Sequence, residues 1–233
     1  LLCGVLLPTS LPAQTDSPDG SKVEKTPPTE VSVDTTEEAA ALAKTVRDRL
    51  ASIPDPRTLK REDLAAVFVT LDEGIDAGRD YVLRFKTDTA EFSRVSVDLG
   101  RLLILNVDRH VGLIARAAKE SGAALTLDQR LAEQVFYLEE VIQLAQGALA
   151  INQLPSAQAC RARVVLGDAL LKCRQHGEAA IQFRDALKLE TSEIDVDELR
   201  IKEVEALELA EDYEAMATAG MACLENHPRS PYL

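Results

Sequence analysis

Histidine and cysteine are the residues of this sequence best suited to catalysis or metal binding, and they are few and widely spaced. The three histidines, His110, His176 and His227, lie far apart in the chain. None of the four cysteines forms a CxxC pair, and no HExxH, GxGxxG, P-loop or GxSxG pattern occurs. His110 falls on an apolar stripe, which favours a core position over a role as base or ligand. We therefore expect no enzymatic activity, metal site or cofactor in these residues.

Cys160, Cys173 and Cys223 are expected to be small, buried residues, as cysteines often are. If Cys160 and Cys173 lie on one helix, they are separated by about 20 Å at 1.5 Å per residue, which is too far for a disulfide. Acidic pairs such as Glu139-Glu140 are adjacent in sequence, so their side chains do not share a helical face. They predict a solvated surface.

The composition favours packed helices and disfavours anionic partners. Of the 233 residues, 46% are hydrophobic, but only 4% are aromatic and Trp is absent. Alanine and leucine supply much of the apolar content, as is typical of helices. The formal net charge of −13 repels phosphate backbones and anionic lipid surfaces. Nucleic acid is therefore not an expected partner.

The first residues resemble the end of a secretory signal. Residues 1–13, LLCGVLLPTSLPA, carry no charge and combine a leucine run with Pro8 and the small residue Ala13. We interpret them as a truncated signal peptide cleaved after Ala13; an apolar N-terminal helix of the mature domain is the alternative. The run is too short to span a bilayer. We expect an exported protein of the periplasm or cell envelope, with no transmembrane span in the mature chain.

The rest of the chain divides into three parts. Residues 14–34 are rich in Pro, Ser, Thr, Asp and Glu, a composition that predicts a disordered linker or tether. Residues 35–154 carry successive helical patterns and are expected to form a helical region, with diverged repeats as one interpretation. Residues 155–233 carry a clearer repeat pattern. The predicted fold class is all-α.

Two parts of the helical region are ambiguous. An apolar pattern from Leu64 starts a helix, Gly74 and Gly78 predict a turn, and residues 75–85 are expected to form the antiparallel partner. Within residues 92–107, alternating apolar and polar residues favour a strand, but an apolar stripe at helical spacing continues for about thirty residues. We predict a helix there.

Residues 160–191 carry a spaced pattern of leucine, glycine, alanine and phenylalanine. Its members are Leu166, Gly167, Leu170, Ala179, Phe183 and Ala186. They match the L-G-x2-Y and A-x3-F parts of a 34-residue helix–turn–helix signature. The stretch therefore resembles a tetratricopeptide repeat of the kind found in exported and envelope proteins of bacteria. In such a repeat Gly167 and Ala179 lie where the two helices cross closely, and Phe183 fills the gap toward the next unit.

A second copy of this pattern is predicted over residues 196–228. Ala215 corresponds to Ala179 at an offset of thirty-six residues, and Pro228 supplies the terminal proline of the signature. A fainter similarity extends upstream of residue 150. Unrelated amphipathic helix pairs are the alternative explanation.

The resemblance implies an α-solenoid of antiparallel helix pairs that binds a protein or peptide on its concave face. This face is lined by the first helix of each unit. The matching positions in the first unit are Arg161, Val164, Asp168, Leu171 and Lys172. A solvated helix face without a partner is the alternative.

Two functions follow from the resemblance. The first is a protein–protein interaction scaffold in the bacterial cell envelope. The second is the helical N-terminal region of a larger exported thioredoxin-like thiol–disulfide oxidoreductase, whose catalytic domain would follow Leu233.

Overall fold

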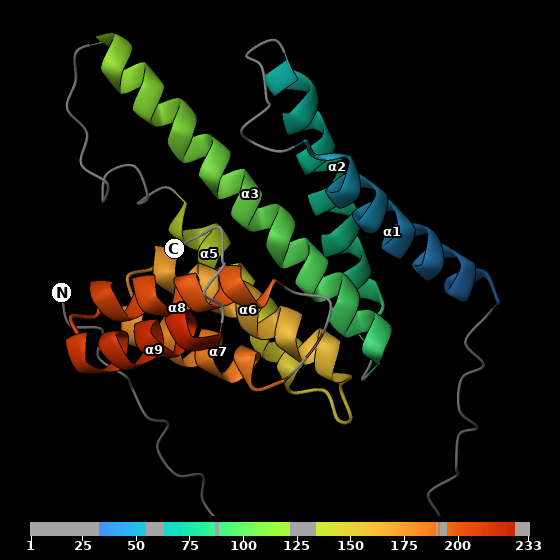
Figure 1. The fold of residues 1–233 in the computed structure, drawn as a ribbon. Coiled ribbons are helices and arrows are strands. Elements are labelled where there is room, and N and C mark those ends of the chain that lie inside the picture. Colours follow the sequence, from blue (N-terminus) through green and yellow to red (C-terminus); the bar gives the residue numbers. More distant parts are fainter. Residues whose placement is uncertain are drawn as a thin grey trace, which may run out of the picture. The chain divides into compact units, whose positions relative to one another are not determined.

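The computed structural model describes residues 33–54, 63–86, 89–121, 134–189, 191 and 195–226. Every regular element in these ranges is an α-helix, so the all-α prediction is confirmed for them. The helices, shown in Figure 1, are α1 (Val33–Ser52), α2 (Leu64–Arg84), α3 (Ala90–Ser121), α5 (Val135–Leu149), α6 (Ser156–Lys172), α7 (His176–Leu187), α8 (Val196–Leu209) and α9 (Tyr213–Asn226). None of these helices has both the length and the apolar character needed to cross a bilayer.

Several sequence predictions concern residues outside the described ranges. They include the signal peptide at 1–13, the tether at 14–34 up to residue 32, and Pro228. The helical unit begins at Val33, so α1 includes the last two residues of the predicted tether.

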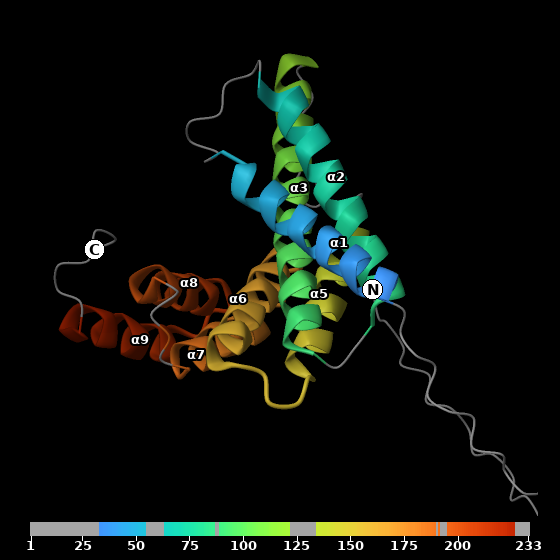
Figure 2. The ribbon, with the colours of Figure 1, turned by 90° about the vertical axis from the view of Figure 1, so that its right-hand side faces the viewer.

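Helix α3 is the centre of the packing. It contacts α1 and α2 and also α5 and α6, and Figure 1 shows it between these two pairs of helices. Helices α6, α7, α8 and α9 then contact one another in chain order, and Figure 2 shows them on the far side of α3 from α2. Elements far apart in sequence therefore meet mainly along α3.

The central position of α3 explains the ambiguous pattern at residues 92–107, which are helical as predicted. Val95, Val97 and Leu99 are all at least 97% buried, although alternate residues point to different sides of a helix. Since four helices surround α3, more than one of its sides is covered. Ser96 and Asp98, which lie between these apolar residues, are buried as well, so the alternation of residue types does not correspond to alternating buried and exposed faces.

The turn predicted near Gly74 and Gly78 is wrong, because α2 continues through both glycines. A Cβ atom at Gly74 would lie 2.9 Å from Leu102 Cδ1 and 3.0 Å from Arg49 Cβ. A Cβ atom at Gly78 would lie 2.9 Å from Leu99 Cδ1. The glycines therefore serve close packing of α2 against α3 and α1, and not a change of chain direction.

The turn between α6 and α7 has the same geometry as the turn between α8 and α9, at positions thirty-seven residues apart. Arg174 and Glu211 have positive φ angles of 61° and 59°. In both turns the amide of the following residue donates to a carbonyl five residues back, at 2.9 and 3.0 Å. This alignment places Met216, and not Ala215, opposite Ala179. The predicted offset of thirty-six is thus one residue short.

Candidate functional site

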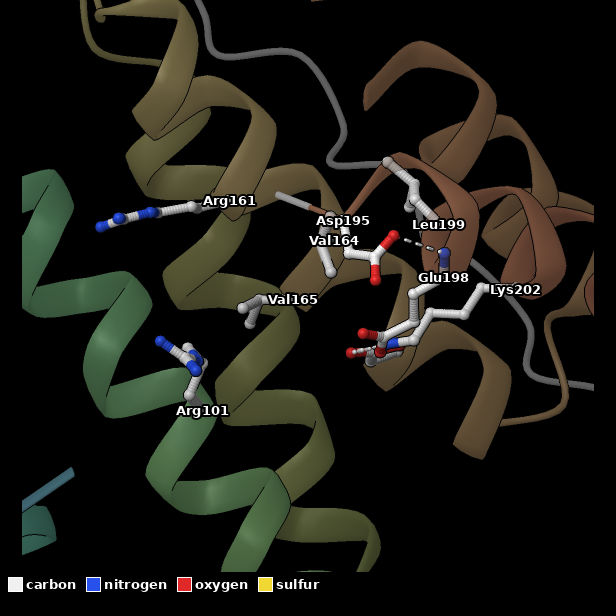
Figure 3. A pocket seen from close by; sticks show the side chains of 9 residues that line it. Arg101, Arg161, Val164, Val165, Asp195, Glu198, Leu199 and Lys202 are labelled. Atoms are coloured by element: carbon white, nitrogen blue, oxygen red, sulfur yellow. Dashed lines mark hydrogen bonds and ion pairs between the residues drawn. The ribbon is translucent and has the colours of Figure 1, made fainter. Parts of the chain in front are cut away.

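A hollow of about 330 Å³ lies where α3, α6 and α8 meet, and Figure 3 shows it from close by. The lining residues are Arg101, Arg161, Val164, Val165, Asp168, Asp195, Glu198, Leu199 and Lys202. A volume of this size is at the lower end of the range for ligand pockets. A second hollow, of about 660 Å³, lies over α7, α8 and α9, but none of the predicted protein-binding residues lines it.

The structure brings three of the five predicted protein-binding residues to the first hollow, namely Arg161, Val164 and Asp168. The other two lie elsewhere. Leu171 packs against the hydrophobic core, and the Lys172 ammonium donates to the carboxylate of Asp108 on α3. The last turn of α6 is therefore used for packing and does not line the hollow.

The predicted repeat-signature residues are mainly core residues. Those that are at least 93% buried are Leu166, Leu170, Ala179, Phe183 and Ala186. Gly167 is also buried, and a Cβ atom at this position would lie 2.5 Å from Phe183 Cε1. The ring of Phe183 therefore lies against α6 of its own helix pair. Ala215 is half-buried.

Apolar side chains form part of the surface of the hollow. Val165 and Leu199 are each 3% exposed, while Val164 is half-buried. In Figure 3 the two valines lie between the arginines and the charged residues of α8. An apolar centre with charged groups around it is the usual composition of a ligand site.

Asp168 and Lys202 form an ion pair between α6 and α8. The Lys202 ammonium donates to both carboxylate oxygens of Asp168, at 2.9 and 3.0 Å, and lies 3.6 Å from the carboxylate of Glu198. Asp195 accepts from the amides of Asp197 and Glu198, which is an N-cap for α8. The α8 end of the hollow is therefore built from carboxylates and one ammonium.

Burial raises the pKa of Asp168, against the opposing effect of the Lys202 ammonium. Burial also opposes the charge on Lys202, but the carboxylates of Asp168 and Glu198 outweigh it and raise the pKa of this lysine. Lys202 is thus charged at neutral pH and remains the fixed cation of this end of the hollow.

Guanidinium groups occupy the opposite, α3 end. Figure 3 shows Arg101 on α3 and Arg161 reaching from α6 toward α3. Beneath Arg161 is a small void of about 10 Å³, also lined by Arg94, Asp98 and Gln158. A void of this size holds about one water molecule.

Asp98 is the buried acid of this end. It is 7% exposed, and no hydrogen bond or ion pair of its carboxylate is found among the described residues. Burial raises its pKa, in spite of the positive charges of Arg101, Arg161, Arg47 and Arg94. The folded protein therefore disfavours the ionised form of Asp98.

We expect Asp98→Asn to raise the free energy of unfolding at neutral pH by about 1 kcal/mol, since it removes the cost of burying an unpaired charge. A raised pKa means that the folded state binds the proton more tightly than the unfolded state. The wild type therefore gains stability relative to the variant as the pH falls from above the folded pKa toward the ordinary value. Urea unfolding of both proteins across this range measures the difference. A difference that grows on acidification would contradict the assignment.

Sequence reasoning missed the residues contributed by α3 and α8. Asp195 has a recognisable signal, because an Asp before an apolar helix is a preferred N-cap. Arg101 has none, since its place in the hollow depends on the contact between α3 and α6, which are not consecutive helices.

Among the described residues, no group of three or more His, Cys, Asp or Glu side chains is arranged to hold a metal ion. Cys160 and Cys223 are buried free thiols, and Cys173 is a half-buried one. Burial raises the pKa of Cys160 and of Cys173, which disfavours the reactive thiolate form. The chemistry that the hollow itself offers is ionic and apolar recognition.

No protein-family model matches the chain, and no match is found among curated proteins.

Proposed function

We propose that the chain is an exported helical-repeat protein of the tetratricopeptide type that acts as a protein–protein interaction scaffold in the bacterial cell envelope. In this proposal a peptide segment of the partner binds in the hollow at α3, α6 and α8. The export part of the proposal rests on the signal-like residues 1–13 and the linker-like residues 14–34.

The order of helix contacts supports the repeat arrangement. Helices α1, α3, α6 and α8 are each followed by a contacting helix, and contacts also join α1 to α3 and α3 to α6. A solenoid of antiparallel pairs produces this pattern when the first helices of successive units line one face. The matching turns at Arg174 and Glu211 support two copies of one helix pair.

The observation that carries the binding function is the composition of the hollow. Its helical lining comes from first helices of three successive pairs, and it combines a valine and leucine centre with charged residues at both ends. An extended peptide can place apolar side chains on the valine and leucine centre and charged side chains at the two ends. Three residues expected at a binding face, Arg161, Val164 and Asp168, lie there.

Filling the hollow is expected to weaken peptide binding. Random peptides displayed on phage are selected on the full chain, and the affinities of enriched peptides are measured by fluorescence polarisation. Val164→Trp should weaken binding by about tenfold or more, because the indole occupies space that the peptide needs. Ile181→Trp is the matched control, since Ile181 is 51% exposed on α7 and does not line the hollow.

Two results would contradict the proposal. One is a selection that enriches no peptide above a blank surface. The other is a set of enriched peptides that bind the Val164→Trp variant as well as they bind the wild type. Circular dichroism of both tryptophan variants shows whether the fold is retained.

A further inference from the structure

The two ends of the hollow carry opposite charge. At the α3 end, two guanidinium groups line it, and Arg101 is exposed. At the α8 end, three carboxylates face one ammonium. Figure 3 shows these groups at opposite sides of the two valines. A charged ligand can therefore distinguish the two ends of the hollow, although the whole chain carries a net negative charge.

One group at each end is available to a ligand. At the α3 end it is Arg101, for which no hydrogen bond or ion pair is found within the described residues. At the α8 end it is Glu198, whose side chain is 55% exposed and lies 3.6 Å from an ammonium that already has Asp168 as its closer partner. Asp195 is used as the cap of its own helix.

Helix α6 gives the length of the hollow along this helix. Arg161 and Asp168 mark the ends of the hollow on this helix, and they are seven residues apart. Seven residues of α-helix rise about 10 Å. An extended peptide covers this distance in about three residues.

We infer that the hollow selects a peptide carrying an acidic and a basic side chain with an apolar residue between them. This inference rests on the proposed function and names the chemistry of its partner. The carboxylate pairs with Arg101 in the field of Arg161, and the basic group pairs with Glu198. The apolar side chain covers Val164. A peptide whose two charged side chains have the same sign leaves the accessible group at one end of the hollow without an oppositely charged partner.

A panel of four labelled peptides tests the inference on the full chain at low ionic strength, where exposed ion pairs are least screened. Their central residues are Glu-Leu-Ala-Lys, Glu-Leu-Ala-Glu, Lys-Leu-Ala-Lys and Gln-Leu-Ala-Gln, with identical flanks. Fluorescence polarisation should show that the mixed-charge peptide binds about fivefold more tightly than the other three. Added salt should reduce this preference.

Charge exchange at the two ends gives a sharper test. Arg101→Glu replaces the accessible cation of the α3 end by a carboxylate and should move the preference to the Lys-Leu-Ala-Lys peptide. Glu198→Lys replaces the accessible carboxylate of the α8 end by an ammonium and should move the preference to the Glu-Leu-Ala-Glu peptide. The double variant exchanges the two accessible charges, so it should again prefer the mixed peptide, bound in the reverse direction. Lys44→Glu and Glu205→Lys are the matched controls; both residues are exposed, lie outside the hollow and should leave the order unchanged.

The outcomes separate the inference from the proposed function. An order of affinities that Arg101→Glu and Glu198→Lys do not change overturns the inference, and the proposed function still stands if Val164→Trp weakens binding. Failure of all four peptides to bind the wild type also overturns the inference, while the phage selection then decides the proposed function separately. Equal binding to the wild type and to Val164→Trp overturns both.

Discussion

Phe183→Ala is expected to lower the free energy of unfolding by about 3–5 kcal/mol, as is usual for the loss of a fully buried aromatic ring. Phe183 has no exposed surface. Its ring lies so close to α6 that Gly167 has no room for a Cβ atom, with three ring carbons within 2.9 Å of where that atom would be. Gly167, which faces the ring from α6, has no side chain that could fill the cavity left by Phe183→Ala. Urea unfolding followed by circular dichroism measures the loss.

Ile181→Ala is the control for this prediction. Ile181 lies on the same helix but is 51% exposed, so its truncation should cost less than about 1 kcal/mol. Equal losses of stability for the two variants would contradict the prediction, because the burial of the Phe183 ring would then make no special contribution.

A double-mutant cycle tests the contact itself. Gly167→Ala should destabilise the wild type but do much less harm in a Phe183→Leu background, because the shorter side chain makes room for the new methyl group. Additive effects would contradict direct packing of the two residues.

The sequence was sufficient to predict those features that depend on the residue pattern of a single helix. The long apolar stripe correctly predicted the helix at 92–107. The helical spacing on α6 placed Arg161, Val164 and Asp168 on one face, and these three line the hollow. Each of these predictions depends on the period of an α-helix and on few distant contacts. Local periodicity therefore gave the fold class and one wall of the hollow.

The sequence was insufficient to predict those features that depend on contacts between helices. The α3 and α8 ends of the hollow depend on how these helices meet α6, so Arg101, Glu198 and Lys202 had no distinguishing signal. The same limit applies to the one-residue error in the repeat offset, because the turn at Glu211 is recognised by its backbone hydrogen bonds and not by its residue types.

Gly74 shows most directly how a residue type with two structural roles misled the prediction. Glycine ends helices because it adopts left-handed backbone conformations, and it also lets helices approach closely because it lacks a side chain. Only the second role applies to α2, which is continuous from Leu64 to Arg84. The two roles predict different effects of substitution.

Gly74→Val is expected to lower the free energy of unfolding by about 2–3 kcal/mol, the cost of overpacking a filled core. The new Cβ would lie 3.0 Å from Arg49 Cβ, an atom next to the backbone of α1, so α1 and α2 must move apart. It would also meet Leu102, which is fully buried and has no space to turn into. Thermal and urea unfolding of the full chain measure the loss.

Gly147→Val separates this clash from the helix propensity of valine. Gly147 is exposed within α5, and a Cβ atom there would meet no other atom within 4 Å. Valine is slightly better than glycine in a helix, so this variant should be neutral or slightly more stable than the wild type. If propensity alone mattered, both substitutions would have the same sign. Equal stability of the two variants would therefore exclude close packing at Gly74 as the reason for its glycine, and a loss confined to Gly74→Val would attribute it to the contacts with α1 and α3.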